Sequence, residues 1–256
     1  MRSRRSGSVQ EGSVSTDGEL VSLEHRPSDS PLVERVWTAR SERAGQFHSI
    51  AEGLSEIVVT RLRRQVFLTL RGPETKATTA DCPAGGDWLG IRLKPGAFLP
   101  LFPPAMLRNR RDLTLPGAGT RSFWLDGSAW EYPTFENADT FVARLVDKGL
   151  IACDRSVDAA VRGERNALSR RSAQRRFAAA TGISYATFRT IKRARHAASL
   201  LRRGVPIVEV VDLAGYFDQP HLNRSLKYLI GQTPVEIAQG GKQLGYLYET
   251  EPLLEQ

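Results

Sequence analysis

Two stretches in the last third of the chain decide its fold, LSRRSAQRRFAAATG at residues 168–182 and GYFDQPHLNRSLKYL at residues 215–229. In the first, Ser169 is a good N-cap for a helix over 170–180, because its hydroxyl can accept a hydrogen bond from an unpaired backbone N–H. In the second, Asp218 serves the same purpose for a helix over 219–229. The sequence therefore predicts two short helices with well-marked starts.

Both predicted helices have an apolar face and a polar face. Ala173 and Phe177 face inward in the first, and Leu222, Leu226 and Leu229 do so in the second. The side chains left on the outer faces are Arg170, Arg171, Gln174 and Arg175 in the first helix and Gln219, His221, Asn223 and Arg224 in the second. Arginine can donate two hydrogen bonds to guanine and glutamine can pair with adenine, so these residues are candidate base or phosphate contacts. A charged face that is merely solvated is the alternative.

A shorter helix is predicted before each of these two helices. One covers about 157–162, and the other covers 206–214 with Pro206 at its start, where a missing backbone N–H costs little. Gly215 supplies the second turn, and Tyr216 and Phe217 beside it are expected to be core anchors.

A long helix is predicted between the two units. Ser184 can cap it, an apolar stripe runs along it, and it continues to about Arg203, while Pro234 can start one last helix. The 18 residues from 186 to 203 would span ~27 Å. A rod of that length can hold two helices roughly one turn of duplex, ~34 Å, apart.

The order of these motifs resembles the DNA-binding domain of AraC/XylS-family regulators. The residues that carry the resemblance are Leu168–Phe177, Thr181-Gly182, Arg193-Ala-Arg195, Ala198, Leu201, Ile207, Gly215–Gln219, Leu222, Arg224–Lys227 and Gly231–Pro234. The resemblance implies two helix-turn-helix units whose second helices enter successive major grooves of DNA. By position it implicates Arg171, Gln174 and Arg175 in the first unit and Gln219, Pro220, His221 and Arg224 in the second.

Two positions depart from the family pattern. Val211 stands where the family usually has a small alanine, so the helix spacing there is expected to be wider. Pro220 stands where the family often has a polar contact, and its backbone nitrogen cannot donate. We therefore expect the second unit to depend more on DNA shape or phosphates.

The positive charge of the chain is concentrated in the same region. The net charge is +8, and residues 155–256 hold 16 Lys and Arg against 9 Asp and Glu, a net of +7. A polyanionic partner for this segment is the natural interpretation, because each neutralised phosphate releases counterions. A merely soluble basic surface is the alternative.

The first half of the chain has a different texture. Short β-prone runs such as 56–62, 65–70 and 88–93 alternate with Gly and Pro breaks, and a helix is expected over 135–146. The predicted fold class is α+β, with a β-rich, barrel-like domain with one or two helices before an all-α domain of two helix-turn-helix units joined by a long linker helix. The predicted domains are a disordered tail at 1–30, a β-rich sensor or dimerisation domain at 31–153, a DNA-binding domain at 154–240 and an acidic tail at 241–256.

The β-rich half loosely resembles the sensor halves of the same family, and the stretch Gly90–Gly96 recurs in one uncharacterised branch. A small-molecule effector is therefore a possible partner. Six aromatic residues are candidates for lining its pocket or, more simply, for filling the core: Trp88, Phe98, Phe102, Phe123, Trp124 and Trp130. Double-stranded DNA is the expected partner, and RNA polymerase or a second copy of the chain are further possible ones.

An enzymatic first half and a sequence-indifferent nucleic-acid binder are the alternatives. Cys82 is a candidate nucleophile, but no neighbouring basic residue lowers its pKa. The two cysteines and four histidines show no metal-ligand spacing, so we expect no metal, no cofactor and no enzymatic activity. The basic start Met1–Arg5 precedes no apolar stretch, and no run approaches the ~18 residues of a membrane span. The expected location is the cytoplasm, in association with the nucleoid.

Overall fold

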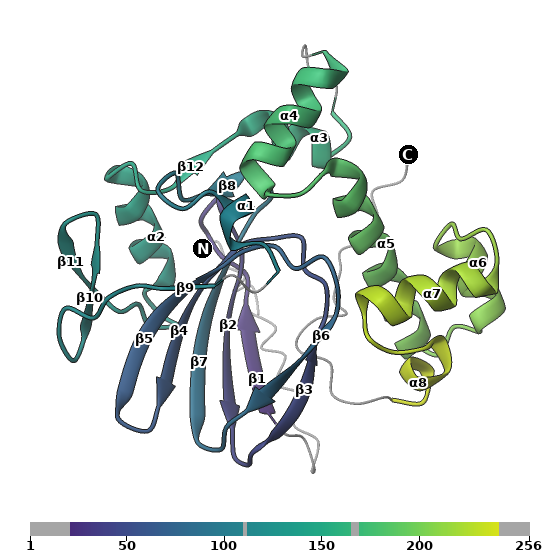
Figure 1. Cartoon of the computed structure of the whole chain (residues 1–256), viewed down its shortest axis with the longest axis horizontal. Helices are drawn as coiled ribbons and strands as arrows, with labels where there is room; N and C mark the ends of the chain where they lie inside the picture. Colours follow the sequence, from purple (N-terminus) through teal and green to yellow (C-terminus); the bar gives the residue numbers. More distant parts are fainter. Residues whose placement is uncertain (1–20, 110–111, 165–168, 241–256) are drawn as a thin grey trace, which may run out of the picture.

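The computed structural model describes residues 21–109, 112–164 and 169–240 (Figure 1). A β-rich part comes first and a helical part follows, and the chain changes from strand to helix between Cys153 and Arg155. The predicted α+β class is confirmed.

The main sheet has six strands in the order β1-β2-β7-β4-β5-β9, and every neighbouring pair is antiparallel. The strands are β1 Val21–Arg26, β2 Val33–Ser41, β7 Gly86–Leu93, β4 Glu56–Leu62, β5 Gln65–Arg71 and β9 Leu113–Thr114. Within the described residues, β1 and β9 form the two edges and do not pair with each other. The sheet is therefore open, and the expected barrel is not closed.

Smaller elements surround this sheet. Three two-stranded pairs are β3 Gly45–Ser49 with β6 Thr78–Cys82, β8 Ala97–Phe98 with β12 Ala152–Cys153, and β10 Ser122–Leu125 with β11 Ser128–Glu131. The β-rich part also contains the helices α1 Pro104–Leu107 and α2 Ala138–Asp147. The predicted helix over 135–146 thus starts three residues late, and Phe135 packs against the core just before it.

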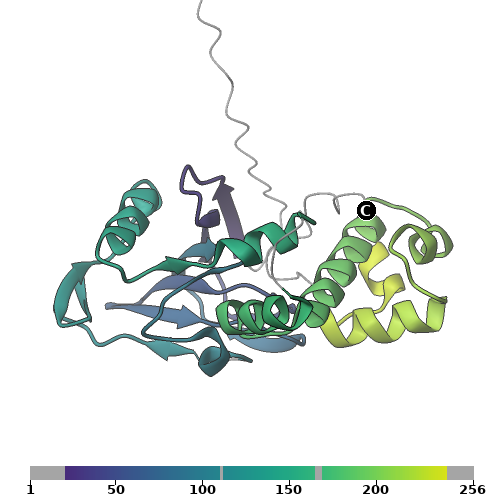
Figure 2. The same cartoon turned by 90° about the horizontal axis from the view of Figure 1, so that it is seen from above.

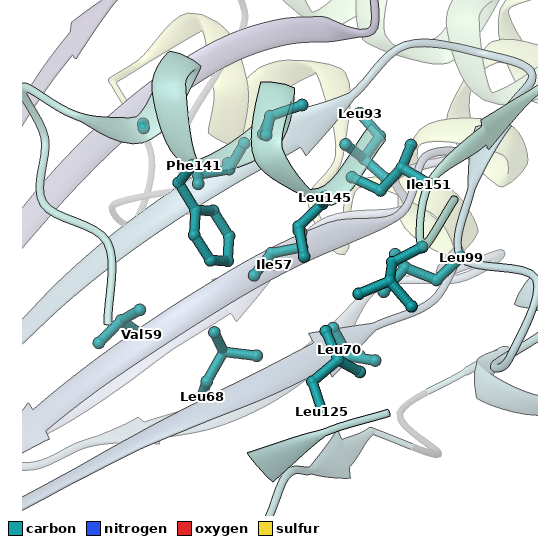
Figure 3. Close-up of a cluster of buried hydrophobic side chains, with 14 of the residues drawn as sticks. Ile57, Val59, Leu68, Leu70, Leu93, Leu99, Leu125, Phe141, Leu145 and Ile151 are labelled. Atoms are coloured by element: carbon teal, nitrogen blue, oxygen red, sulfur yellow. The ribbon is translucent and has the colours of Figure 1, made fainter. Parts of the chain in front are cut away.

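Alternating side chains of the strands serve two different cores. Ile57 and Val59 of β4 point to one face of the sheet, where they meet Phe141 and Leu145 of α2 (Figure 3). Val58, between them, packs on the opposite face in a smaller cluster with Trp37, Val21 and Cys82. This two-residue period is the expected consequence of strand geometry, and it explains why runs such as 56–62 read as strands in the sequence.

The predicted disorder of residues 1–30 is wrong where the structure describes the chain. Val21–Arg26 forms the edge strand β1, in which Val21 is buried beside Trp37 and pairs with Ser41 of β2. The composition of the segment suggested too little apolar surface to order it, but backbone pairing with β2 supplies the missing stabilisation. Residues 1–20 and the acidic tail 241–256 lie outside the described residues.

The six aromatic residues do not line one cavity. Phe123 and Trp130 are buried in the core between the sheet and α2, while Trp124 is 47 % exposed. Trp88 packs on the other face of the sheet, and Phe98 packs against the helical part. The simpler interpretation, that most of these aromatic residues fill cores, agrees with this arrangement.

The helical part contains α3 Arg155–Val161, α4 Arg170–Thr181, α5 Tyr185–Arg202, α6 Ile207–Leu213, α7 Gln219–Leu229 and α8 Pro234–Ala238. One core joins all of them, and Ile50, Ala51 and Leu54 from the β-rich part belong to the same core. The two parts of the chain are consequently packed against each other through shared apolar residues.

Candidate nucleic-acid interface

The helix α4 presents all four of its predicted polar residues to solvent. Its N-cap Ser169 accepts a hydrogen bond from the Ser172 backbone N–H at 3.3 Å. Phe177, Ala180 and Thr181 are buried on the inner face. The predicted contact residues Arg170, Arg171, Gln174 and Arg175 are all exposed.

The remaining arginine of α4 has a structural role. Arg176 donates two hydrogen bonds to the carboxylate of Asp154, at 2.7 and 3.0 Å, and Asp154 is also the N-cap of α3. Burial by itself raises the pKa of Asp154, but the hydrogen bonds from Arg176 and Ser156 outweigh it and leave that pKa below its ordinary value. This carboxylate therefore stays charged at neutral pH and holds α3 and α4 at a fixed angle.

The end of α4 rests on α1 of the β-rich part. Gly182 has φ +75°, a conformation that favours glycine, and it ends the helix. A Cβ at this position would lie 2.7 Å from backbone atoms of Pro104 and Ala105. Glycine is therefore favoured here both by the positive φ and by the lack of space for a side chain. Its small size allows the end of α4 to pack directly on the backbone of α1.

The helix α7 presents most, but not all, of its predicted polar residues. Its N-cap Asp218 accepts a hydrogen bond from the His221 backbone N–H at 2.7 Å, and its three leucines are buried. The side chains of Gln219, Pro220, Asn223 and Arg224 are exposed. His221 is half-buried. Its ring packs nearly perpendicular to the Tyr216 ring, with the ring centroids 5.1 Å apart.

The turn before α7 contains one wrong prediction. Tyr216 is buried as expected, and its hydroxyl lies 2.9 Å from that of Ser225. Phe217 is 91 % exposed, so it is not a core anchor. Consecutive residues in a turn point in different directions. The Tyr216 side chain points inward, and the guanidinium of Arg193 of α5 stacks on its ring, 4.5 Å from the centroid.

The long helix α5 fixes the relative position of the two units. It has 18 residues, so it is ~27 Å long, and its buried stripe includes Phe188, Ile191, Ala198 and Leu201. Seen from above, α4 and α7 lie along the same side of the helical part, whereas α3 and α6 lie toward the other side (Figure 2). Both helices thus lie on one side of the molecule, and each has an exposed polar face.

The β-rich part holds the carboxyl end of α7. The last carbonyl groups of a helix have no partner within the helix. Here the carbonyl of Tyr228 accepts a hydrogen bond from the Ala77 N–H at 2.9 Å, and that of Leu229 accepts one from the Ala51 N–H at 2.7 Å. Glu52 and Glu74 pair through two backbone hydrogen bonds of 2.9 and 2.7 Å, so the two donor segments are joined to each other.

A buried ion cluster lies at the same junction, and sequence reasoning missed it. Glu52 contacts Arg92 of β7 at 3.2 Å and Arg195 of α5 at 2.5 Å, and Arg92 also contacts Glu56 at 2.7 Å. Both arginines are at most 5 % exposed. Burial raises the pKa of Glu52, but Arg195 and Arg92 lower it more, so the net pKa lies below its ordinary value. No local motif signals a cluster whose members are far apart in sequence.

The candidate nucleophile Cys82 lies in an environment that disfavours its reactive form. Cys82 is buried, and burial raises the pKa of its thiol despite a hydrogen bond involving Ser41, so the reactive thiolate is disfavoured. Among the described residues, no group of three or more His, Cys, Asp or Glu side chains is placed to hold a metal ion. None of the described helices combines the length and apolar character that crossing a membrane requires.

Comparison with known families agrees with this geometry. Residues 163–240 match the family described as a helix-turn-helix domain, and residues 24–111 match a domain of unknown function (DUF6597). No curated protein and no solved structure matches the chain. The fold and the first match define a helix-turn-helix protein. More particularly, the two matches together fit a DNA-binding transcription regulator of the AraC type whose N-terminal domain is uncharacterised.

Proposed function

We propose that this regulator binds specific DNA sequences by placing α4 and α7 in two successive major grooves on one face of the duplex. The observation that carries the proposal is the exposure of both helices on the same side of α5 (Figure 2). Arg171, Gln174 and Arg175 are the proposed base readers of the first unit. A duplex presents successive major grooves about 34 Å apart on one face, and a rigid α5 of ~27 Å is compatible with that spacing when the DNA bends slightly.

The two units are proposed to contribute differently. Three exposed arginines and a glutamine on α4 suit direct contacts with guanine and adenine. On α7, the backbone nitrogen of Pro220 cannot donate a hydrogen bond, and the His221 ring packs against the ring of Tyr216. We therefore assign Gln219, Asn223 and Arg224 to a mixture of base and phosphate contacts, with DNA shape supplying part of the selectivity.

The β-rich half is proposed to modulate DNA binding through the junction with α7. A small molecule or protein partner that shifts the segments around Ala51 and Ala77 would move the backbone N–H groups that bind the last carbonyls of α7. Such a shift would change the position of the second unit relative to the first. The coupling is supported by the ion cluster of Glu52, which joins the main sheet to α5.

The test begins with selection of bound sequences from a random DNA pool by the full chain. Two half-motifs about one helical turn apart are expected for each monomer. On the selected operator, Arg175→Ala should cost about 1–3 kcal/mol of binding free energy, measured by fluorescence anisotropy, and little on random DNA. Arg121→Ala is the matched control, because Arg121 is an exposed arginine beside the β10–β11 pair, far from α4 and α7 (Figure 1).

Two outcomes would contradict the proposal. Equal losses of Arg175→Ala on operator and random DNA would make Arg175 a phosphate contact rather than a base reader. Failure of the wild type to prefer any selected sequence over random duplex at physiological salt would indicate a sequence-indifferent binder.

A further inference from the structure

A groove between α5 and α7 is closed on its third side by the β-rich half. It has a volume of about 750 Å³. Its lining residues are Thr75 and Arg108 from the β-rich half, Ile183, Ser184, Ala186, Thr187 and Thr190 at the start of α5, and His221, Arg224, Ser225, Tyr228 and Leu229 from α7. None of these described lining residues is acidic, and two are arginines. Both halves of the chain therefore contribute to this groove, which combines apolar and hydroxyl-bearing side chains with two positively charged arginines.

Arg108 is held in this groove by a fixed backbone. The next residue, Asn109, has φ +58°, and its side-chain oxygen accepts hydrogen bonds of 2.9 Å from both the backbone N–H and the hydroxyl of Thr75. The preceding residue, Leu107, is buried and packs closely on Gly72. A Cβ added to Gly72 would lie only 2.5 Å from atoms of Leu107. The Arg108 side chain itself is exposed. An arginine on a rigid support loses less freedom when it binds an anion.

The same support is tied to α7. Ala77, two residues after Thr75, donates its backbone N–H to the Tyr228 carbonyl at 2.9 Å. Arg108 is consequently kept in a defined position relative to Arg224, which lines the same groove from α7. The exposed Lys76 lies between the two tying residues and adds to the positive charge of this segment.

Duplex geometry brings phosphates to this groove if α4 and α7 read DNA as proposed above. On one face of a duplex, two successive major grooves are separated by the minor groove with a phosphate strand on each side. These phosphates would pass beside the groove that Arg108, the start of α5 and α7 line together. We infer that Arg108 binds a backbone phosphate beside that minor groove, and that the β-rich half is thereby part of the DNA interface. This inference rests on the proposed function.

The salt dependence of binding tests the inference on the full chain. The slope of log K against log salt concentration is negative, and each lost phosphate contact makes it less steep by about 0.9. Compared with the wild type, Arg108→Ala should therefore lose roughly threefold less affinity between about 50 and 200 mM salt. Its affinity at low salt should fall on the operator and on random duplex alike, because a phosphate contact carries no sequence information. Arg108→Lys, which keeps the charge, should retain most of the slope, and Arg121→Ala should keep the wild-type slope.

The outcomes separate this inference from the proposed function. If Arg108→Ala has the slope and affinity of Arg121→Ala while Arg175→Ala still loses operator preference, the inference fails and the proposed function stands. A loss confined to the operator would also overturn the phosphate assignment. If the wild type itself shows no operator preference, the proposed function fails first. Equal thermal unfolding midpoints of Arg108→Ala and the wild type exclude misfolding as the cause of any loss.

Discussion

The two helix-turn-helix units are similar in shape but are held in place by different means. The helix α4 is tied to its own unit by the ion pair of Arg176 with Asp154 and by the packing of Phe177 against Tyr185 and Phe188. The helix α7 is tied to the other half of the chain, which supplies backbone donors to the end of the helix.

The first unit has the more arginine-rich exposed face, and α4 packs both on α3 and α5 and on α1 and β8 of the β-rich half. The second unit has fewer arginines on its exposed face, and backbone donors of the β-rich half hold the end of α7. If the β-rich half modulates DNA binding as proposed, a shift around Ala51 and Ala77 would act directly on the end of α7. Three experiments can break or sharpen this contrast.

The largest effect is expected from Glu52→Gln. The carboxylate of Glu52 joins the sheet to α5 by contacting Arg92 and Arg195, two arginines that are nearly fully buried. The substitution removes this negative charge. Losing one partner of a buried ion pair costs about 3–5 kcal/mol of unfolding free energy, and we expect the lower end because Glu56 still contacts Arg92. Denaturant unfolding measures the loss, with exposed Glu42→Gln as the control.

The pH dependence of the same variant gives a second measurement. The pKa of Glu52 lies below its ordinary value of 4.5, so its contribution to stability is complete above that pH and disappears as pH falls through the folded-state pKa. The gap between wild type and Glu52→Gln should thus be constant near neutral pH and shrink in acid below pH 4.5. A gap that widens on acidification would show that Glu52 is not the stabilising charge.

An intermediate effect is expected from Ala77→Pro. Proline removes the N–H that binds the Tyr228 carbonyl, which should loosen α7 and cost about 1–2 kcal/mol of operator binding. Hydroxyl-radical footprinting should show lost protection only on the half-motif contacted by α7. The mirror variant Arg176→Ala should weaken protection only on the other half-motif, because it frees α4 from Asp154.

A matched proline variant controls for general damage to the β-rich half. Ala118 donates its N–H to the Ser122 carbonyl at 2.9 Å in a loop far from α7, so Ala118→Pro also removes one backbone donor. It should leave both half-footprints intact. Loss of both half-motifs in Ala77→Pro would contradict separate support of the two units.

The smallest effect is expected from Phe217→Ala. Because Phe217 is 91 % exposed, its truncation should change the unfolding free energy by less than about 0.5 kcal/mol. Tyr216→Ala serves as the contrasting control and should cost about 3 kcal/mol, as much as Glu52→Gln, since Tyr216 is buried and hydrogen-bonded to Ser225. Thermal unfolding of the two variants measures these losses. Similar losses of unfolding free energy for Phe217→Ala and Tyr216→Ala would mean that Phe217 is buried against other residues in solution.

Elements with local signals were predictable from the sequence. The helix α7 spans 219–229 as expected, α4 ends one residue later than predicted, and α5 is shifted by one residue at each end from the predicted 186–203. These boundaries are set by Ser169, Ser184 and Asp218, whose side chains accept hydrogen bonds within the first turn of each helix. A cap and its helix are neighbours in sequence, so the pattern is visible without the fold.

Features that depend on distant residues were not predictable. The strand β1 is composed like a disordered tail and is ordered by pairing with β2, and β9 leaves the sheet open although the strands were expected to close. Phe217 and Tyr216 are neighbouring aromatic residues, yet the structure buries Tyr216 beneath Arg193 and against α7 and leaves Phe217 exposed. Arg108 carries no sign in the sequence that it faces the helical part.

The sequence by itself determined the two capped helices, the long rod between them and the concentration of positive charge around them, because all three follow from short-range patterns and composition. The tertiary structure alone decided that Glu52 joins Arg92 to Arg195, and that the β-rich half closes a groove beside α7. Those contacts depend on how two separately patterned halves pack, and packing depends on complementary surfaces whose residues are far apart along the chain.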